Sequence, residues 1–256
     1  MKFKIDNMSF CELQGKSVLV TGASSGIGMQ AAISISRQGG KLIITGRNEE
    51  KLAETFDRLE GSGHQMIAAN LIVDEDRDAL IDMIPDLDGV VYCAGIVGPT
   101  PAKYIRQDDI KKMFGINFKA PVLLSAAILK SKKLKVGASI VMMSSVVTES
   151  PYYGGALYAS SKGAVEAYTK TLALELVDRK VRVNCISPGL VNTPLITDPA
   201  KESNVEIVDD SIQRYVAKYP MGIGEAEDVA NTIVFLLADE SRWISGTKIE
   251  MGAVIR

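Results

Sequence analysis

Tyr158 and Lys162 stand four residues apart, in a segment whose periodicity from Leu157 to Leu174 is typical of a helix. One helical turn places the two side chains on the same face. A free phenol has a pKa of about 10, and a neighbouring ammonium charge favours the phenolate and so lowers that pKa. The pair therefore suits general acid–base catalysis near neutral pH, with Tyr158 as the proton donor.

Two hydroxyl groups precede this pair in the chain. The apolar run from Ala138 to Met143 predicts a strand, and it ends in Ser144 and Ser145. Ligands bind at the carboxyl ends of the strands in open α/β sheets. We therefore expect a serine hydroxyl at a ligand-binding edge, close to Tyr158.

A glycine-rich loop at residues 21–28 lies between an apolar strand-like run, 17–20, and a helical segment, 29–37. Backbone N–H groups in such a loop, together with the positive end of the following helix, favour the pyrophosphate of a dinucleotide. Because this loop lies between a strand and a helix, it indicates a dinucleotide site more strongly than three glycines alone would. The candidate contacts are Gly22, Ser24, Ser25, Gly26, Ile27 and Gly28.

Strand-like and helix-like segments alternate along most of the chain, which predicts an α/β fold with a doubly wound parallel sheet (a Rossmann fold) in three layers. The length of 256 residues fits a single domain, 1–256. A polar, turn-rich stretch at 194–219 interrupts the pattern and is predicted to be a flap that covers the substrate. Candidate strands lie at 17–20, 41–45, 65–69, 89–93, 139–143, 180–186 and 247–251, and candidate helices at 29–37, 48–59, 74–84, 108–130, 157–174 and 225–238.

Composition excludes several classes of partner. The net charge is only −2, from 29 basic and 31 acidic residues, so we expect neither nucleic acid nor an anionic membrane surface as partner, and instead a small molecule. Cys11, Cys93 and Cys185 are far apart and His64 is the single histidine, so neither a disulfide framework nor a metal site is predicted. With no signal peptide or bilayer-spanning segment expected, the chain is predicted to be cytoplasmic.

The loop motif TGxxxGIG at 21–28, the strand-ending serine pair and the YxxxK motif together resemble the short-chain dehydrogenase/reductase family, in its single-domain branch and close to the 3-oxoacyl carrier-protein reductases. The resemblance assigns Ser145 to the substrate carbonyl and Tyr158 to proton donation. Lys162 would hold the ribose hydroxyls and lower the pKa of Tyr158. Asn117 would bend its helix and hold a water that links Lys162 to solvent.

The turn after the second strand favours NADP over NAD as cofactor. It contains Arg47 and no carboxylate, and a guanidinium suits a 2′-phosphate, which Ser24 could also reach. Asn70 stands where the family usually has an aspartate near the adenine, and Cys93 replaces an asparagine that ties adjacent strands. The further cofactor contacts that the resemblance implies are Asn70, Leu71, Ala94, Gly95, Tyr158, Lys162, Pro188, Gly189, Val191 and Thr193.

The resemblance implies hydride transfer from NADPH to a ketone or aldehyde, and the reverse alcohol oxidation. A 3-oxoacyl thioester is the first substrate candidate, and a sugar or polyol dehydrogenase of the same family is the alternative. A third hypothesis is that the chain is a catalytically silent NADP-binding scaffold protein. The apolar helices at 108–130 and 158–177 predict a homodimer or homotetramer.

Overall fold

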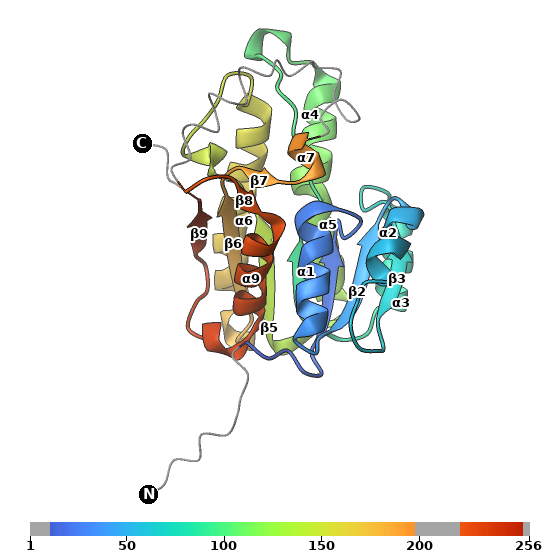
Figure 1. The fold of residues 1–256 in the computed structure, drawn as a ribbon. Coiled ribbons are helices and arrows are strands. Elements are labelled where there is room, and N and C mark those ends of the chain that lie inside the picture. The colour runs from blue at the N-terminus through green and yellow to red at the C-terminus, as the bar shows by residue number, and fades with distance from the viewer. Residues whose placement is uncertain (1–10, 198–220, 253–256) are drawn as a thin grey trace, which may run out of the picture.

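A seven-stranded sheet forms the centre of the computed structural model, which describes residues 11–197 and 221–252 (Figure 1). Its strand order is β3-β2-β1-β4-β5-β6-β9, and every neighbouring pair is parallel. The doubly wound fold is therefore confirmed. The strands are β1 (Ser17–Thr21), β2 (Lys41–Gly46), β3 (Gln65–Ala68), β4 (Leu87–Tyr92), β5 (Leu134–Met143), β6 (Arg182–Pro188) and β9 (Lys248–Met251).

Helices cover both faces of the sheet and complete the three layers. On one face α1, α2 and α9 pack over the strands, and Figure 1 shows α1 and α9 side by side. On the other face lie α3, α5 and α6. A short pair, β7 (Val191–Asn192) and β8 (Gly224–Glu225), stands apart from the main sheet. The helices are α1 (Gly26–Arg37), α2 (Glu49–Phe56), α3 (Asp74–Met83), α4 (Gln107–Phe114), α5 (Ala120–Lys130), α6 (Ala156–Glu175), α7 (Pro194–Thr197) and α9 (Ala226–Leu237).

Central strands such as β1 and β6 are almost wholly buried because helices cover both of their faces. β6 is buried at every residue, and β1 at all but its first. Alternate side chains of these strands enter the two core clusters, so that Leu19 packs toward α3 and α5 while Val18 and Val20 pack toward α1 and α9. This packing places the carboxyl ends of all seven strands along one edge.

The helix predicted at 108–130 is not continuous. α4 ends at Phe114, and a wider π-helical turn over Gly115–Lys119 precedes α5. Asn117 lies within that turn, and its side-chain amide bonds the backbone of another segment, which favours the wider turn. β5 also starts earlier than predicted, with Gly137 at φ +80 and a shift in register against β4.

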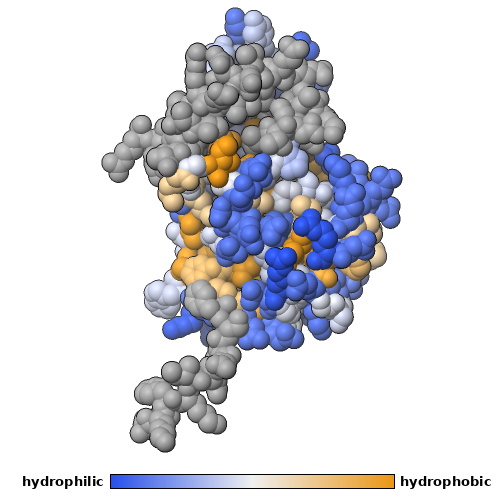
Figure 2. Space-filling view, viewed as in Figure 1, coloured by the Kyte–Doolittle hydropathy of each residue, from blue (hydrophilic) through white to orange (hydrophobic). Residues whose placement is uncertain are grey.

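The stretch Gln107–Lys130 is long and apolar enough, by length and composition, to cross a membrane, which differs from the sequence expectation. In the fold, however, Leu124 and Ile128 of α5 pack into the core against the sheet, and this packing explains the apolar composition. Figure 2 shows polar residues predominating over the α1 and α2 side of the molecule. The predicted flap at 194–219 lies outside the described residues except for α7, which is residues 194–197.

Candidate active site

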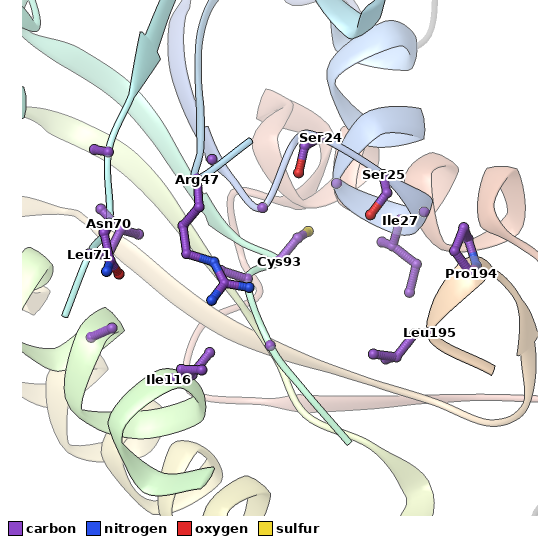
Figure 3. Close-up of a pocket in the computed structure, with 18 of the residues that line it drawn as sticks. Ser24, Ser25, Ile27, Arg47, Asn70, Leu71, Cys93, Ile116, Pro194 and Leu195 are labelled. Atoms are coloured by element: carbon purple, nitrogen blue, oxygen red, sulfur yellow. The ribbon is translucent and has the colours of Figure 1, made fainter. Parts of the chain in front are cut away.

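A cleft opens at the carboxyl edge of the sheet, where the strand order reverses between β1 and β4 (Figure 3). It encloses about 990 Å3 of empty space, part of which is open solvent. The loop after β1, the ends of β2 and β3, and the segment after β4 form its walls. The predicted cofactor residues that line it are Gly22, Ser24, Ser25, Gly26, Ile27, Gly28, Arg47, Asn70, Leu71, Ala94, Gly95 and Thr193.

Two glycines of the loop have no room for a side chain. Gly22 has φ +66, and a Cβ there would lie 2.6 Å from the backbone nitrogen of Ala94. A Cβ at Gly28 would lie 2.2 Å from the carbonyl oxygen of Gly22. The turn is therefore packed backbone against backbone at the start of α1, and this cradle suits a pyrophosphate beside the helix N-terminus.

The end of β2 carries the cation that faces this cleft. Arg47 extends into the pocket from the residue after Gly46, as Figure 3 shows. The Ser24 hydroxyl oxygen would lie 3.2 Å from a Cβ at Gly46, so the serine and the guanidinium belong to the same corner. Arg47 makes no ion pair with any residue that the structure describes. The corner can therefore receive an anionic group of a ligand.

The loop after β3 is held by the first turns of α3. The Asn70 backbone N–H donates to Oδ2 of Asp76 at 2.7 Å. Arg77, which is buried, donates from Nη1 to the carbonyl oxygen of Leu71 at 2.9 Å and pairs with Asp74. Asn70 and Leu71 thus line the cleft on a loop whose backbone is bonded by two side chains of one helix, Asp76 and Arg77.

Ser145 is the second residue after β5 and is buried. Its hydroxyl oxygen accepts a hydrogen bond from the Val147 N–H at 3.4 Å, and in the described part of the chain the hydroxyl donates none. Ser144 points elsewhere, because its hydroxyl donates to Oε1 of Glu166 at 2.6 Å. The geometry therefore separates a serine that can donate to a ligand from one that is already used structurally.

Lys162 lies beneath the cleft, on the α6 turn that follows Tyr158. Its Nζ donates to the carbonyl oxygen of Met143 at 2.9 Å and lies 5.7 Å from the centre of the Tyr158 ring. A Cβ at Gly95 would lie 3.5 Å from this Nζ, so the ammonium is next to the cleft wall. Burial lowers the pKa of Lys162 to about 8.

Asn117 connects the π-helical turn to the segment after β4. Its Oδ1 accepts from the Ile96 N–H at 2.8 Å, and its Nδ2 donates to the Ile96 carbonyl oxygen at 3.0 Å and to Oγ of Ser161 at 3.0 Å. A Cβ at Gly95 would lie 3.3 Å from Oδ1, so Asn117 and Lys162 face the same glycine. Asn117, Ser145 and the α6 pair Tyr158 and Lys162 thus come from three parts of the chain. Asn117 is bonded to α6 through Ser161, and Lys162 bonds the end of the strand that precedes Ser145.

Comparison with known proteins assigns the family. The family model described as enoyl-(acyl carrier protein) reductase matches residues 22–252. The 3-oxoacyl-acyl-carrier-protein reductase FabG of Rickettsia felis is 34% identical over 241 residues, which are 94% of this chain and 96% of the relative. A solved structure titled short chain dehydrogenase/reductase family protein superimposes with a TM-score of 0.80 at 27% identity, covering 94% of this chain and 97% of that one. The chain belongs to the short-chain dehydrogenase/reductase family.

Other members differ in what they act on. The glucose 1-dehydrogenase of Gluconobacter oxydans is 32% identical over 245 residues, 91% of this chain and 88% of the relative. A short-chain dehydrogenase/reductase structure from Mycobacterium marinum shares the fold, with a TM-score of 0.84 at 24% identity. As a family member, the protein is an NAD(P)-dependent oxidoreductase that acts on carbonyl or alcohol groups.

Five predicted cofactor residues do not line the cleft of this short-chain dehydrogenase/reductase. Tyr158 and Lys162 lie on α6, Pro188 ends β6, Gly189 follows it, and Val191 begins β7. Sequence reasoning also missed several lining residues. These are Gly46, Ala69, Ile72, Cys93, Ile116, Ala120, Pro194 and Leu195, most of them neighbours of predicted residues, which is the signal that could have found them.

Cys93 lines the cleft as a neutral thiol. Burial raises its pKa to about 12, although the charge of Lys162 opposes this shift. Because the Cys93 thiol is neutral, it does not compensate the positive charge of Lys162. At this strand end the Thr21 hydroxyl accepts from the Ala94 N–H at 3.4 Å, which is a weak tie between β1 and the segment after β4.

Proposed function

We propose that this protein is an NADPH-dependent reductase of ketones or aldehydes, with a 3-oxoacyl thioester as its substrate. The observation that carries the proposal is the arrangement around Lys162, whose ammonium is bonded to the end of the Ser145 strand and lies one helical turn from Tyr158. Lys162 thereby links the strand that precedes Ser145 to the helix that carries Tyr158, next to Gly95 in the wall of the cleft. The FabG relative, a 3-oxoacyl-acyl-carrier-protein reductase, supports the choice of substrate.

The preference for NADPH rests on the corner formed by Arg47 and Ser24. A guanidinium and a hydroxyl at this place suit a 2′-phosphate, whereas an NAD-specific site would offer a carboxylate to the free ribose hydroxyls. Gly22 and Gly28 leave bare backbone at the start of α1 for the pyrophosphate. When bound, the cofactor supplies the hydride.

The chain's own residues supply the rest of the chemistry. The Ser145 hydroxyl donates a hydrogen bond to the substrate carbonyl oxygen and so favours the negative charge that develops there. Tyr158 donates its phenolic proton to the same oxygen. The Lys162 ammonium favours the phenolate that remains and would hold the ribose hydroxyls of the cofactor. Asn117 would hold a water through which the proton is replaced.

A substrate screen tests this proposal. NADPH oxidation is followed with an acetoacetyl thioester, simple ketones and aldehydes, a sugar series and an enoyl thioester, with NADH in parallel. We expect the 3-oxo thioester to react fastest with NADPH, and Tyr158→Phe to lose nearly all activity while it still binds NADPH. Equal rates for wild type and Tyr158→Phe would refute the assigned acid.

Two alternatives have distinct outcomes in the same screen. The glucose 1-dehydrogenase relative supports a sugar or polyol dehydrogenase, which would reduce NADP when given the sugar alcohol or aldose. A catalytically silent scaffold protein would bind NADPH and turn over none of the compounds. The presence of Ser145, Tyr158 and Lys162 favours an enzyme over the scaffold.

We also propose a cytoplasmic homodimer or homotetramer that binds neither nucleic acid nor a membrane. Leu174 and Val177, at the end of α6, are 74% and 59% exposed, and such apolar residues favour contact with a second copy. Light scattering gives the mass, and an oligomer should dissociate when Leu174 is replaced by aspartate. Fractionation of cells tests the location.

A further inference from the structure

Glu166 accepts hydrogen bonds from the two hydroxyl residues on either side of Ser145. The Ser144 hydroxyl lies 2.6 Å and the Thr148 hydroxyl 2.9 Å from the same carboxylate oxygen, Oε1. The Thr148 hydroxyl also lies 3.2 Å from the Ser145 carbonyl oxygen, and the Ser145 hydroxyl forms no hydrogen bond with Glu166. A single carboxylate therefore binds the short turn that carries Ser145 at both of its ends.

The position of Glu166 on α6 relates this turn to the other catalytic groups. Glu166 follows Lys162 by four residues and Tyr158 by eight, so the three side chains lie along one face of the helix. The Ser145 turn comes from the end of β5, and Tyr158 comes from α6. Glu166 thus joins the two elements whose separation sets the distance from the Ser145 hydroxyl to the Tyr158 phenol.

Lys248 of β9 compensates the negative charge behind Ser145. Its Nζ lies 2.6 Å from Glu149 Oε1, 2.9 Å from Glu250 Oε1 and 3.7 Å from Glu166 Oε2. Burial by itself would lower the pKa of Lys248, but its hydrogen bonds to Glu149 and Glu250 and the charge of Glu166 raise it overall. Lys248 therefore stays cationic and leaves Glu166 Oε1 free to accept from the two hydroxyls.

We propose that Glu166 is a positioning residue that holds the Ser145 hydroxyl in line with Tyr158. The proposal rests on the function proposed above, and Glu166 itself touches neither substrate nor cofactor. A displacement of a reacting group by about 1 Å can lower a rate by up to about 100-fold, so loss of the carboxylate should slow the chemical step. Cofactor binding should not change, because in the described part of the chain no residue that lines the cleft forms a hydrogen bond or an ion pair with Glu166.

The first test compares Glu166→Leu with Glu166→Gln. The glutamine keeps an Oε1 that can accept from Ser144 and Thr148, whereas leucine leaves both hydroxyls without their acceptor. We expect Glu166→Leu to lower kcat about tenfold with an unchanged Kd for NADPH, and Glu166→Gln to restore kcat to within about threefold of wild type. Equal losses in the two variants, or a wild-type kcat in Glu166→Leu, would overturn the positioning role.

Should Glu166→Leu fail to fold, Ser144→Ala removes the shorter of the two hydroxyl bonds and leaves the carboxylate with Thr148 and Lys248. We expect Ser144→Ala to lower kcat in the same direction with unchanged NADPH binding. A wild-type kcat in this variant would contradict the proposal.

A double-mutant cycle separates positioning from general destabilisation. If Glu166 acts through Ser145, then Glu166→Leu should cause no further loss in a Ser145→Ala background, whereas independent effects would multiply. A wild type that reduces no carbonyl at all would refute the proposed function and the positioning role with it. A wild type slowed by Ser145→Ala but not by Glu166→Leu would refute the positioning role alone.

Discussion

The Lys162 ammonium donates a hydrogen bond to the carbonyl oxygen of Met143 at 2.9 Å, so the helix that carries Tyr158 is joined to the last residue of β5 by a buried charge. In the described part of the chain no carboxylate pairs with this ammonium. A buried cation without a counter-charge destabilises the folded state, and it is retained where function requires it.

Replacement of Lys162 by methionine should abolish activity and stabilise the protein. The pKa of Lys162 is about 8 in the folded state against 10.5 for the ordinary side chain, which corresponds to a penalty of about 3 kcal/mol below pH 8. Loss of the bond to Met143 offsets about 1 kcal/mol of this. We therefore expect the free energy of unfolding at pH 7 to rise by about 1–2 kcal/mol.

The sign of the pH dependence provides the check. Between pH 8 and 10.5 the unfolded chain binds the lysine proton and the folded protein does not, so wild-type stability rises with pH in this window relative to Lys162→Met. Urea unfolding at pH 7 and pH 10 measures the difference, with the exposed Lys170→Met as control. A stability gap that is independent of pH would contradict the burial penalty.

The elements that the sequence predicted well are those whose pattern is local. The fully buried strands, the helical periodicity around Tyr158 and the glycine loop all depend on neighbouring residues, and the structure places each of them within a few residues of its predicted bounds. The local pattern predicted one continuous helix at 108–130, and only the family resemblance implied a bend at Asn117. The π-helical turn there depends on a bond to Ile96, which lies 21 residues away in the sequence. Glu166 gave no signal either, since its partners precede it by 18 and 22 residues.

Gly22→Ala should prevent dinucleotide binding and destabilise the fold. The new Cβ would lie 2.6 Å from the backbone nitrogen of Ala94, and φ +66 is strained for alanine, so β1 and the segment after β4 would have to separate. We expect a loss of about 2–4 kcal/mol in the free energy of unfolding and at least a 100-fold weaker NADPH complex.

The matched control is Gly98→Ala. No atom lies within 4 Å of a Cβ at Gly98, and its φ lies outside the strained region. Thermal unfolding and NADPH fluorescence titration should leave this variant within experimental error of wild type. Wild-type cofactor affinity in Gly22→Ala would show that the loop does not hold the pyrophosphate.

Arg47→Leu should remove the preference for NADPH. The guanidinium projects into the cleft and has no ion pair among the described residues, so its loss affects the bound ligand more than the fold. A charge-assisted hydrogen bond contributes about 1.5–3 kcal/mol, which corresponds to about a 10- to 100-fold rise in the KM for NADPH. The KM for NADH should change by less than about threefold. Arg37→Leu, at the far end of α1, is the control cation, and equal effects on the two cofactors would refute the 2′-phosphate role of Arg47.

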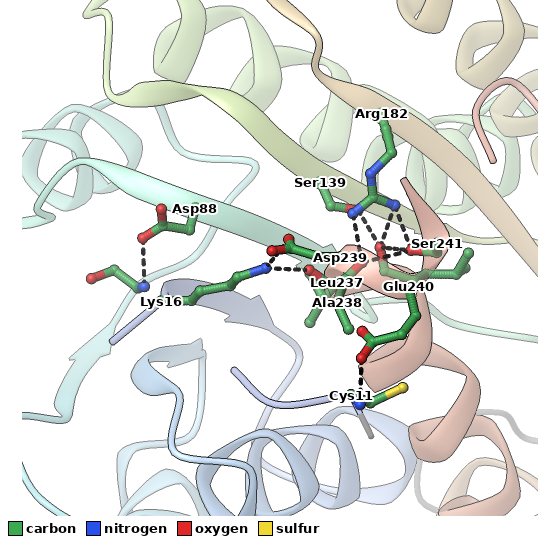
Figure 4. A network of polar contacts seen from close by, with 12 residues as sticks. Cys11, Lys16, Asp88, Ser139, Arg182, Leu237, Ala238, Asp239, Glu240 and Ser241 are labelled. Atoms are coloured by element: carbon green, nitrogen blue, oxygen red, sulfur yellow. Dashed lines mark hydrogen bonds and ion pairs between the residues drawn. The ribbon is translucent and has the colours of Figure 1, made fainter. Parts of the chain in front are cut away.

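Arg182→Met should lower the free energy of unfolding without changing kcat. Figure 4 shows the buried Arg182 guanidinium among the groups that end α9. It donates to the Leu236 carbonyl oxygen at 2.7 Å, the Ala238 carbonyl oxygen at 3.2 Å and the Ser241 hydroxyl at 2.7 Å. A cation at a helix C-terminus is favoured by the helix dipole. Its removal takes the charged donor from the carbonyls of Leu236 and Ala238 and leaves only the hydroxyls of Ser139 and Ser241 to bond them. We expect a loss of about 3 kcal/mol.

Lys16 is the matched control, because it binds the same helix end from the surface. Its Nζ pairs with Asp239 at 2.6 Å, but the Asp239 side chain is 88% exposed, and exposed pairs contribute about 0–1 kcal/mol. Lys16→Met should therefore lower the free energy of unfolding by less than about 1 kcal/mol. Arg182 is the first residue of β6, at the amino ends of the strands, whereas the cleft lies at their carboxyl ends. The kcat of the folded fraction should therefore equal that of wild type in both variants. Urea unfolding and kcat, measured on the same preparations, separate the effect on stability from the effect on catalysis. Equal destabilisation by the two substitutions would show that the buried Arg182 guanidinium stabilises the fold no more than the surface ion pair of Lys16 does.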